Sequence, residues 1–293
     1  MKVILVSVGN FQEYLLDNIT NLILHNNTNI TLITEIKYFN KLINFPNVEL
    51  IDCNSLISND INNYINNSKL DKHFRNGFWY LCSLRFFYIY EYIKKYNLEN
   101  VVHLENDVLI YENLENIKNC FKKNKVYAPF DCNTRVIPSF IFIPNYICFK
   151  PIIDNYNLNL NDMENLAIFD ETVIEPLPIF IFNISNEILK LNKNYLDFNC
   201  IFDAAAIGQY LGGIDKQNDP KDTIGFVNET CVIKYNKYKF NWLKTNNLWY
   251  PYIIIDNKNI KIINLHIHSK ELNKFLSNNP IENNLILLNE NFS

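Results

Sequence analysis

Apolar positions divide the first hundred residues into short strands and amphipathic helices that alternate. Runs typical of buried strands lie at residues 3–8, 30–34, 48–52 and 101–104. Between them, apolar residues recur at helical spacing after Phe11, a second helix follows a Ser55 cap, and a long aromatic helix is predicted across residues 78–96. Strands that alternate with helices in this way indicate parallel βαβ units with both sheet faces covered. We therefore predict an α/β fold with a central, mostly parallel sheet flanked by helices.

The second half of the chain follows a less regular pattern. Strands are predicted at 126–130 and 139–143, and a short helix at 203–211 that begins at Asp203 and ends at Gly212 and Gly213. Strands at 248–255 and 260–266 flank a polar turn, which predicts a C-terminal β-hairpin. Residues 154–175 are polar and acidic, so we expect an irregular, mobile rim there. No repeat or linker interrupts the pattern, and residues 1–293 are predicted to form one domain.

Composition narrows the class of protein. A hydrophobic content of 48%, a charged content of 20% and a net charge of −4 are typical of a globular protein and give no reason to expect a nucleic-acid partner. No apolar run reaches the roughly 20 residues that span a bilayer, and the first residues do not form a signal peptide. Seven scattered cysteines without CxxC spacing indicate reduced thiols. We therefore expect a cytoplasmic protein. The high content of Asn, Ile, Lys and Tyr is typical of proteins from A/T-rich genomes, including those of some large DNA viruses.

Two carboxylates directly follow the fourth predicted strand. Glu105 and Asp107 stand one residue apart in the stretch VVHLENDVLIY. Ligands of open parallel sheets bind beyond the carboxyl ends of the strands, where this pair and Gly9 are expected to lie. Mg²⁺ and Mn²⁺ are usually held by one or two carboxylates together with substrate phosphates. The pair therefore predicts a divalent-metal site, although a solvated polar turn would show the same short motif.

A second set of metal-binding side chains lies near the C-terminus, in NLHIHSKEL. His266 and His268 would share one face of a strand, since alternate residues point the same way. Lys270 follows them and can meet a phosphate as a point charge. The alternative is a pair of inert, hydrogen-bonded core histidines.

Arginine is scarce in this chain, which has three arginines against twenty-four lysines. Arg75, Arg85 and Arg135 are therefore candidates for bidentate contacts with phosphate or carboxylate groups, for which lysine is a poor substitute. The alternative is that they form surface ion pairs, each worth about 0–1 kcal/mol.

Together these segments resemble the metal-dependent nucleotide-sugar glycosyltransferases of the GT-A fold. HLENDVLIY resembles their strand that ends in a DxD motif, and SLRFFYIYEYI, with Arg85, is similar to the donor-binding helix of glycogenin-like and bacterial galactosyltransferase relatives. NLHIHSK resembles their C-terminal His and Lys, and FDAAAIGQYLGG the segment with the acceptor-side acid. The resemblance spans most of the chain. Two departures are the longer Glu105 in place of the usual Asp and a tighter His-to-Lys spacing, which leaves open whether His266 or His268 binds the metal.

The resemblance implies a GT-A (Rossmann-like) hexosyl- or N-acetylhexosaminyltransferase. It would use Mn²⁺ or Mg²⁺ and move a sugar from a nucleotide-diphosphate donor, UDP-sugar first, to a glycan or glycoprotein hydroxyl. Residues 1–110 would form the donor half, 111–276 the acceptor half with the histidines, and 277–293 a polar tail. The implied metal ligands are Glu105, Asp107, His266 and His268. The implied donor-binding residues are Val8, Gly9, Asn10, Arg75, Arg85, Glu105, Asn106 and Lys270.

The implied acceptor end consists of Asp203, Arg135 and Gln209. Arg135 and Gln209 would position a sugar, and Asp203 is the candidate general base. Asp203 also suits a simple helix cap. A base there favours inversion at the anomeric carbon, whereas the glycogenin-like resemblance favours retention, so the stereochemistry stays open.

Two other classes of protein compete with this interpretation. A sugar-nucleotide pyrophosphorylase-like nucleotidyltransferase would share the sheet and the metal, but its Gly-rich, Arg-containing loop is missing from VSVGNFQEYL. A non-catalytic carbohydrate-binding protein would suit the aromatic content of 14%. It would not explain why the acid pair, the histidines and Lys270 occur together.

Overall fold

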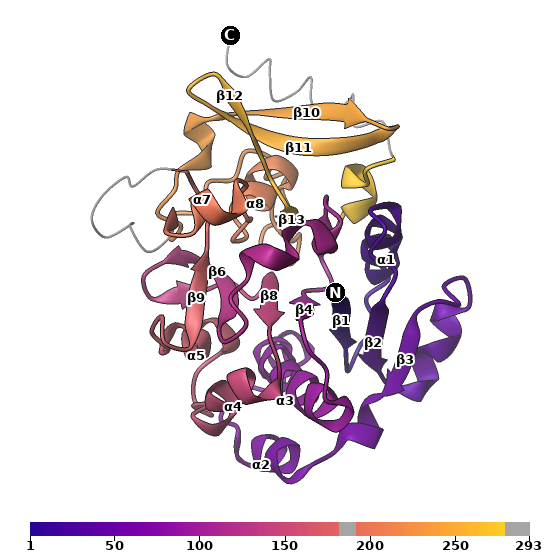
Figure 1. The fold of residues 1–293 in the computed structure, drawn as a ribbon. Helices are drawn as coiled ribbons and strands as arrows, with labels where there is room; N and C mark the ends of the chain where they lie inside the picture. Colours follow the sequence, from indigo (N-terminus) through magenta and orange to yellow (C-terminus); the bar gives the residue numbers. More distant parts are fainter. Residues whose placement is uncertain (182–191, 279–293) are drawn as a thin grey trace.

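A computed structural model describes residues 1–181 and 192–278 of the chain and shows an α/β fold. The central sheet has the strand order β3-β2-β1-β4-β8-β6-β7, with β9 paired to β6 (Figure 1). Its strands are β1 (Lys2–Ser7), β2 (Ile30–Thr34), β3 (Glu49–Asp52), β4 (Val101–Leu104), β6 (Val126–Cys132), β7 (Arg135–Val136), β8 (Phe140–Ile143) and β9 (Ile174–Leu177).

The strands of the first half are all parallel, as the alternating pattern predicts. β3, β2, β1 and β4 run the same way, and β8 then pairs antiparallel to β4. The predicted strands at 30–34 and 101–104 coincide with β2 and β4. The carboxyl ends of four parallel strands therefore meet at one edge of the sheet.

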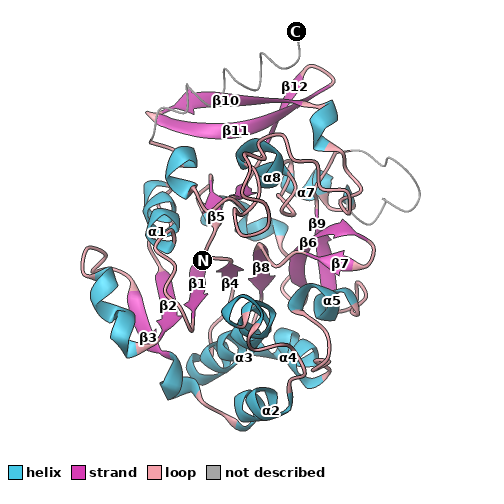
Figure 2. Cartoon of the chain, turned by 180° about the vertical axis from the view of Figure 1, so that it is seen from behind, coloured by secondary structure: helices cyan, strands magenta, loops and turns pink. Residues whose placement is uncertain are grey.

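Helices cover both faces of this sheet (Figure 2). Leu15, Ile19 and Leu22 of α1 pack in one buried cluster with alternate residues of β1 and β2, and α3 and α4 contribute to the cluster on the other face. The helices are α1 (Leu15–Leu24), α2 (Asn59–Asn67), α3 (Phe78–Tyr96), α4 (Tyr146–Asp154), α5 (Asp162–Ala167), α7 (Tyr195–Phe198) and α8 (Ile207–Gly212). Short 3-10 turns lie at Ile36–Leu42, Cys53–Leu56, Phe74–Asn76, Leu114–Cys120, Tyr235–Lys237 and Leu272–Phe275.

The long helix α3 occupies the residues that the sequence predicts. It is apolar on most of its circumference, which is typical of a helix buried on more than one side. Gly77, at φ 81°, precedes its first turn, and Asn97, at φ 47°, ends it in the left-handed conformation that suits a helix terminus. The helix spans the sheet from Phe78 and places Arg85 in its middle.

Several sequence predictions need correction. The first helix begins at Leu15, later than Phe11, and the second is capped by Ser58 instead of Ser55, because residues Cys53–Leu56 form a separate 3-10 turn. The expected irregular rim at 154–175 contains α5 and the start of β9. The side chain of Asn161 and that of Glu164 form a reciprocal capping box at α5, which explains why so polar a segment is helical.

The predicted C-terminal hairpin is present but ends early. β10 (Lys239–Thr245), β11 (Leu248–Ile255) and β12 (Lys258–Lys261) form a separate antiparallel sheet above the central one (Figure 1). The chain then leaves this sheet, and β13 (Asn264–His266) pairs antiparallel with β5 (Val108–Ile110). This second pairing brings the C-terminal histidines to the end of β4. Of the predicted tail, residues 279–293 lie outside the described part of the chain.

Within residues 1–181 and 192–278, none of the helices combines the length and the apolar composition that a bilayer crossing requires.

Candidate metal centre and donor cavity

The acid pair lies on a tight turn between β4 and β5. The Val108 N–H donates to the Glu105 carbonyl at 3.2 Å, and Asn106 Nδ2 donates to the Val6 carbonyl at 2.8 Å and to Gln12 Oε1 at 2.6 Å. Asn18 Nδ2 donates to the Glu105 carbonyl at 3.1 Å. The neighbouring strand β1 and helix α1 thus fix the turn, which holds both carboxylates at the carboxyl edge of the sheet.

Strand β13 brings His266 to the same place. His266 pairs with Val108 in the β5–β13 ladder, and the next residue, Ile267, donates its N–H to the Asp107 carbonyl at 2.9 Å. His266 Nε2 lies 3.0 Å from Asp107 Oδ2, and His266 Nδ1 lies 3.5 Å from Glu105 Oε2. One ligand atom from each of Glu105, Asp107 and His266 falls within 4.8 Å of the others.

These three side chains suit a divalent cation. Bonds of about 2.0–2.2 Å from carboxylate oxygen or imidazole nitrogen place atoms on opposite sides of one ion about 4.4 Å apart. The observed spread therefore needs only a small adjustment. His266 Nδ1 is buried and has no hydrogen-bond partner among the described residues, so a donor nitrogen is free at the centre of the group. Burial lowers the pKa of His266, but the carboxylates of Asp107 and Glu105 outweigh this effect and leave the pKa above its ordinary value.

Lys270 adds a positive charge beside the acid pair. Its Nζ forms an ion pair with Asp107 Oδ2, the same oxygen that faces His266. Burial alone would raise the pKa of Asp107, but His266 and Lys270 reverse this and hold the pKa well below its usual range. Asp107 is therefore an ionised carboxylate, the form that binds metal.

Arg85 approaches Glu105 from helix α3. Its Nη2 lies 2.8 Å from Glu105 Oε1 and 2.6 Å from Asp162 Oδ2, and its Nε is buried without a partner among the described residues. Burial raises the pKa of Asp162, and the adjacent guanidinium opposes this rise. The sequence interpretation missed Asp162, which belongs to the segment expected to be an irregular rim. The only local signal was the capping pattern of α5.

His268 lies apart from the metal-binding group. Strand β13 ends at His266, and the two rings are 6.2 Å apart between centroids. His268 Nδ1 accepts the Asp215 N–H at 3.0 Å, which requires the neutral ring. Burial, with help from Lys270, lowers the pKa of His268 to about 4. Of the two candidate histidines, the structure groups His266 with the carboxylates.

The Asp203 carboxylate binds backbone N–H groups at the start of α8 and in β13. Its Oδ1 accepts the N–H groups of Ala206 and Ile207 at 2.9 and 2.8 Å, and its Oδ2 accepts those of Gly208 and His266 at 2.8 and 2.9 Å. The residue is fully buried, and burial raises its pKa. The geometry therefore argues against Asp203 as a general base, because both oxygens are bound to backbone and neither reaches the cavity.

The contact between α8 and β13 also leaves no room for a side chain at Gly208. A Cβ on this residue would lie 2.0 Å from the His266 carbonyl oxygen, so α8 packs directly against β13. The backbone of β13 therefore fills the space beside Gly208 and Asp203.

A cavity of about 340 Å³ opens over the acid pair and contains most of the predicted site. Its lining includes Tyr14, Arg75, Arg85, Glu105, Asn106, Asp107, Arg135, Asp162, Gln209, His266, His268 and Lys270. A smaller hollow of about 120 Å³ adjoins it, and Val8 and Asn10 line this hollow together with Arg75, Arg85 and Asn106. Every predicted site residue except Asp203 and Gly9 therefore lines one of these two spaces.

The backbone of Gly9 is already occupied by protein contacts. Its N–H donates to Glu35 Oε1 at 2.9 Å, and its carbonyl accepts the Tyr38 hydroxyl at 2.7 Å. At φ 85°, a Cβ here would also lie 2.8 Å from a Leu81 methyl group. Gly9 thus serves the turn after β1 and its packing on α3, and the structure does not support the expectation that a ligand approaches its backbone.

The other two arginines line the cavity and are themselves paired. Arg135 binds both carboxylate oxygens of buried Asp131. Arg75 donates to Asp215 Oδ2 at 2.8 Å, to Asn218 Oδ1 at 2.8 Å and to Gln217 Oε1 at 3.1 Å. Asn228 Nδ2 donates to Gln209 Oε1 at 3.0 Å, so the Gln209 amide group is also held in place. Contacts within the protein therefore hold the side chains of Arg75, Arg135 and Gln209 in place.

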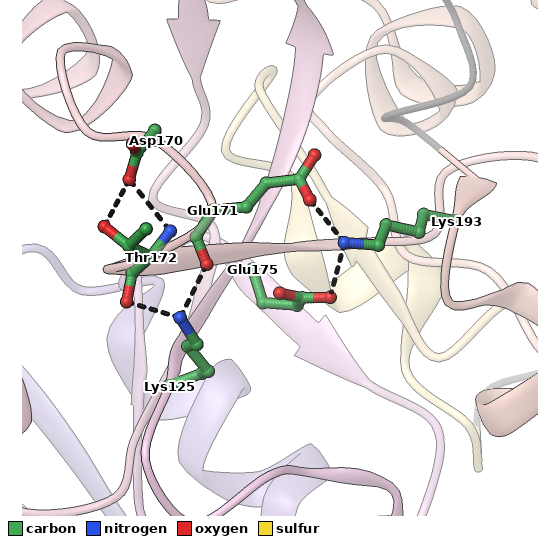
Figure 3. Close-up of a pocket in the computed structure, with 6 residues that line it drawn as sticks. All are labelled: Lys125, Asp170, Glu171, Thr172, Glu175 and Lys193. Atoms are coloured by element: carbon green, nitrogen blue, oxygen red, sulfur yellow. Dashed lines mark hydrogen bonds and ion pairs between the residues drawn. The ribbon is translucent and has the colours of Figure 1, made fainter.

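A hollow of about 480 Å³ lies elsewhere, beside β9, and has a different chemistry (Figure 3). Lys193 pairs with Glu171 and, at 3.2 Å, with Glu175, while Lys125 donates to the carbonyls of Glu171 and Thr172. Its charged groups are thus bound to one another, to backbone carbonyls or, for Asp170, to Thr172. The lining, Lys125, Asp170, Glu171, Thr172, Glu175 and Lys193, has no histidine or cysteine. We place the functional site at the acid pair for this reason.

Comparisons with known proteins give likenesses of fold only. No family model matches the sequence, and no curated protein matches it. Among solved structures, the chain is similar to the galactosyltransferase LgtC, with 13% identity over 61% of this chain and 73% of that one and a TM-score of 0.39. Mouse xyloside xylosyltransferase 1 (7% identity, 60% and 84% coverage, TM-score 0.41) and the glycosyltransferase GlyE of Streptococcus pneumoniae (16% identity, 65% and 53% coverage, TM-score 0.41) are similar to the same degree. At this level the similarity concerns the arrangement of the backbone.

Proposed function

We propose that this protein is a divalent-metal-dependent glycosyltransferase of the GT-A type that uses a nucleotide-diphosphate sugar. The observation that carries the proposal is the group formed by Glu105, Asp107 and His266, with Arg85 and Lys270 in contact with its two carboxylates. All five side chains line one cavity at the carboxyl edge of a parallel sheet. Carboxylates, an imidazole and two cations together suit a metal–diphosphate complex.

The chemistry to be catalysed is the departure of a nucleoside diphosphate from an anomeric carbon. Mn²⁺ or Mg²⁺, held by Glu105, Asp107 and His266, would act as a Lewis acid on the diphosphate oxygens. The positive charges of Lys270 and Arg85, which line the same cavity, would stabilise these oxygens as negative charge develops on them. Because these donors are fixed by the fold, they need little reorganisation when the bond breaks.

The two adjoining spaces suggest how the donor lies. We place the nucleoside in the smaller hollow, where Val8 gives an apolar wall and Asn10, Arg75 and Asn106 give polar ones. The transferred sugar and the acceptor hydroxyl would then lie toward Arg135 and Gln209, on the opposite side of the acid pair. In this proposal the donor is a UDP-sugar, the enzyme is of the hexosyl- or N-acetylhexosaminyltransferase class, and the acceptor is a glycan or glycoprotein hydroxyl.

The direct test is release of nucleotide from a panel of UDP- and GDP-sugars with Mn²⁺, with water or simple glycosides as acceptors. The proposal predicts release of a nucleoside diphosphate, with loss of activity in EDTA and recovery when Mn²⁺ is restored. Formation of a nucleoside triphosphate from the sugar nucleotide and pyrophosphate would instead identify a nucleotidyltransferase. Sugar binding without turnover of any donor would identify a carbohydrate-binding protein.

A further inference from the structure

Helix α5 brings a second carboxylate, that of Asp162, into contact with Arg85. Asp162, its first residue, is 2% exposed, and its Oδ2 lies 2.6 Å from Arg85 Nη2. The local cap of α5 is made by Asn161 and Glu164, and Asp162 adds only its Oδ1, which accepts the Met163 N–H at 3.0 Å and leaves Oδ2 for Arg85. Helix capping therefore does not explain the contact between Asp162 and Arg85.

A single guanidinium nitrogen of Arg85 contacts the carboxylates of both Glu105 and Asp162. Arg85 Nη2 carries two hydrogens and lies 2.8 Å from Glu105 Oε1 as well as 2.6 Å from Asp162 Oδ2. Glu105 is thereby held through one oxygen only. Its other oxygen, Oε2, stays on the side of His266, 3.5 Å from Nδ1.

An arginine without this second partner would bind differently. A guanidinium and a carboxylate prefer a bidentate arrangement with two parallel N–H···O bonds. Arg85 has a spare donor for it, because its Nε is buried and unpartnered among the described residues. If Arg85 used two donors on Glu105, Oε2 would be drawn away from His266 and Asp107.

We propose that Asp162 is a positioning residue that holds Arg85 to a one-atom ion-pair contact with Glu105 and so keeps Glu105 Oε2 available to the metal. This inference rests on the metal site of the proposed function. Asp162 acts through Arg85: its Oδ2 accepts from Arg85 Nη2 and its Oδ1 from the Met163 N–H. Partners of this kind, one step beyond the ligands, typically change metal affinity about 10–100-fold when they are removed.

The test is Mn²⁺ binding by electron paramagnetic resonance, with Mn²⁺ alone and without a sugar donor. Asp162→Ala is expected to weaken Mn²⁺ binding about 10–100-fold. Asp162→Asn keeps an oxygen acceptor without its charge and is expected to fall between Asp162→Ala and the wild type. Adding Arg85→Met to Asp162→Ala should recover part of the affinity, because no guanidinium then competes for Glu105. The matched control is Asp154→Ala, which removes an exposed aspartate that pairs with Lys150 on α4.

The outcomes separate this inference from the proposed function. Failure of the wild-type protein to bind Mn²⁺ would overturn the metal site itself. If the wild type binds Mn²⁺ and Asp107→Asn does not, but both Asp162 variants bind as the wild type does, only the role of Asp162 is overturned. Weak binding by Asp162→Ala without recovery in the double variant also overturns it, since a merely structural loss would not be relieved by removing Arg85. Should Asp162→Ala fail to fold, Asp162→Asn decides by the same comparison with the wild type.

Discussion

The carboxylate of Asp203 accepts the backbone N–H of His266 at 2.9 Å, so a buried acid lies directly behind a candidate metal ligand. The same carboxylate accepts three N–H groups at the start of α8. Helix α8 and strand β13 are thus joined through a single side chain. This relationship gives Asp203 a role in holding His266 in place.

We expect Asp203→Asn to destabilise the fold. An amide nitrogen cannot accept N–H donors, so at least one of the two oxygen positions is lost, and hydrogen bonds to charged groups contribute about 1.5–3 kcal/mol each. Urea unfolding should show a loss of at least about 2 kcal/mol, with weaker Mn²⁺ binding. Unchanged stability together with collapsed turnover and intact donor binding would instead restore Asp203 as the general base.

The two histidines should respond differently to substitution. His266→Gln is expected to weaken Mn²⁺ binding by at least about tenfold, since an imidazole ligand is lost. His268→Asn is the matched variant, because its amide oxygen can accept the Asp215 N–H in place of Nδ1. It should bind Mn²⁺ as the wild type does. Equal losses in the two variants would show that His268 also ligates the metal.

Arg75 is expected to hold residues 214–218 at the cavity. It adopts φ 48°, which is unusual for a residue other than glycine, and its guanidinium binds three side chains of that segment. Arg75→Gly relieves the backbone strain and removes all three hydrogen bonds, each worth about 0.5–1.5 kcal/mol. Hydrogen exchange of the 214–218 amides should accelerate, and nucleotide affinity should fall. Arg75→Lys should show a smaller effect in the same direction, and unchanged exchange in both variants would refute the role.

Stability should decrease as the pH falls from 7 to 5. Burial lowers the pKa of His25 to about 4 and that of His103 to about 3, and His268 behaves similarly. In the unfolded chain these residues titrate near 6.5, so the unfolded state takes up protons first. Their contribution is fully present above pH 6.5 and is lost as the pH falls toward 4. Each histidine contributes a slope of about 1.4 kcal/mol per pH unit.

His25→Gln provides the check on this pH dependence. It removes one titrating group beside Ser277, to whose hydroxyl His25 Nε2 is hydrogen-bonded at 2.6 Å. Urea unfolding at pH 7, 6 and 5 should show a shallower pH dependence in the variant, whatever its stability at pH 7. An identical slope would mean that folding does not lower the pKa of His25.

The parts of the site that follow a strand or helix period could be predicted from the sequence. A short apolar run located β4, and the acids that follow it could then be placed at the carboxyl edge of the sheet. The long aromatic stretch at residues 78–96 likewise predicted α3 and hence the position of Arg85. His266 was a candidate because an alternate-residue histidine pair near a lysine is unusual.

Side-chain contacts between segments far apart in the sequence could not be predicted, because they leave no periodic pattern of apolar residues. Asp162 stands in a polar segment with a strong local cap, and only the tertiary contact with Arg85 shows that its side chain is buried. The choice between His266 and His268 depends on where β13 leaves the β5 ladder, and therefore on pairing between distant segments. The bond between Asp203 and the His266 N–H could not be predicted for the same reason, since this fourth donor comes from β13.

The central claim is that Glu105, Asp107 and His266 bind a divalent cation that in turn binds a nucleoside diphosphate. Isothermal calorimetry of UDP binding, with and without Mn²⁺, tests it most directly in the wild type and in Asp107→Asn. The account predicts that Mn²⁺ strengthens UDP binding by at least about tenfold in the wild type and has no effect in Asp107→Asn, with both proteins folded. UDP binding that is independent of Mn²⁺, or a Mn²⁺ effect that survives Asp107→Asn, would contradict the account.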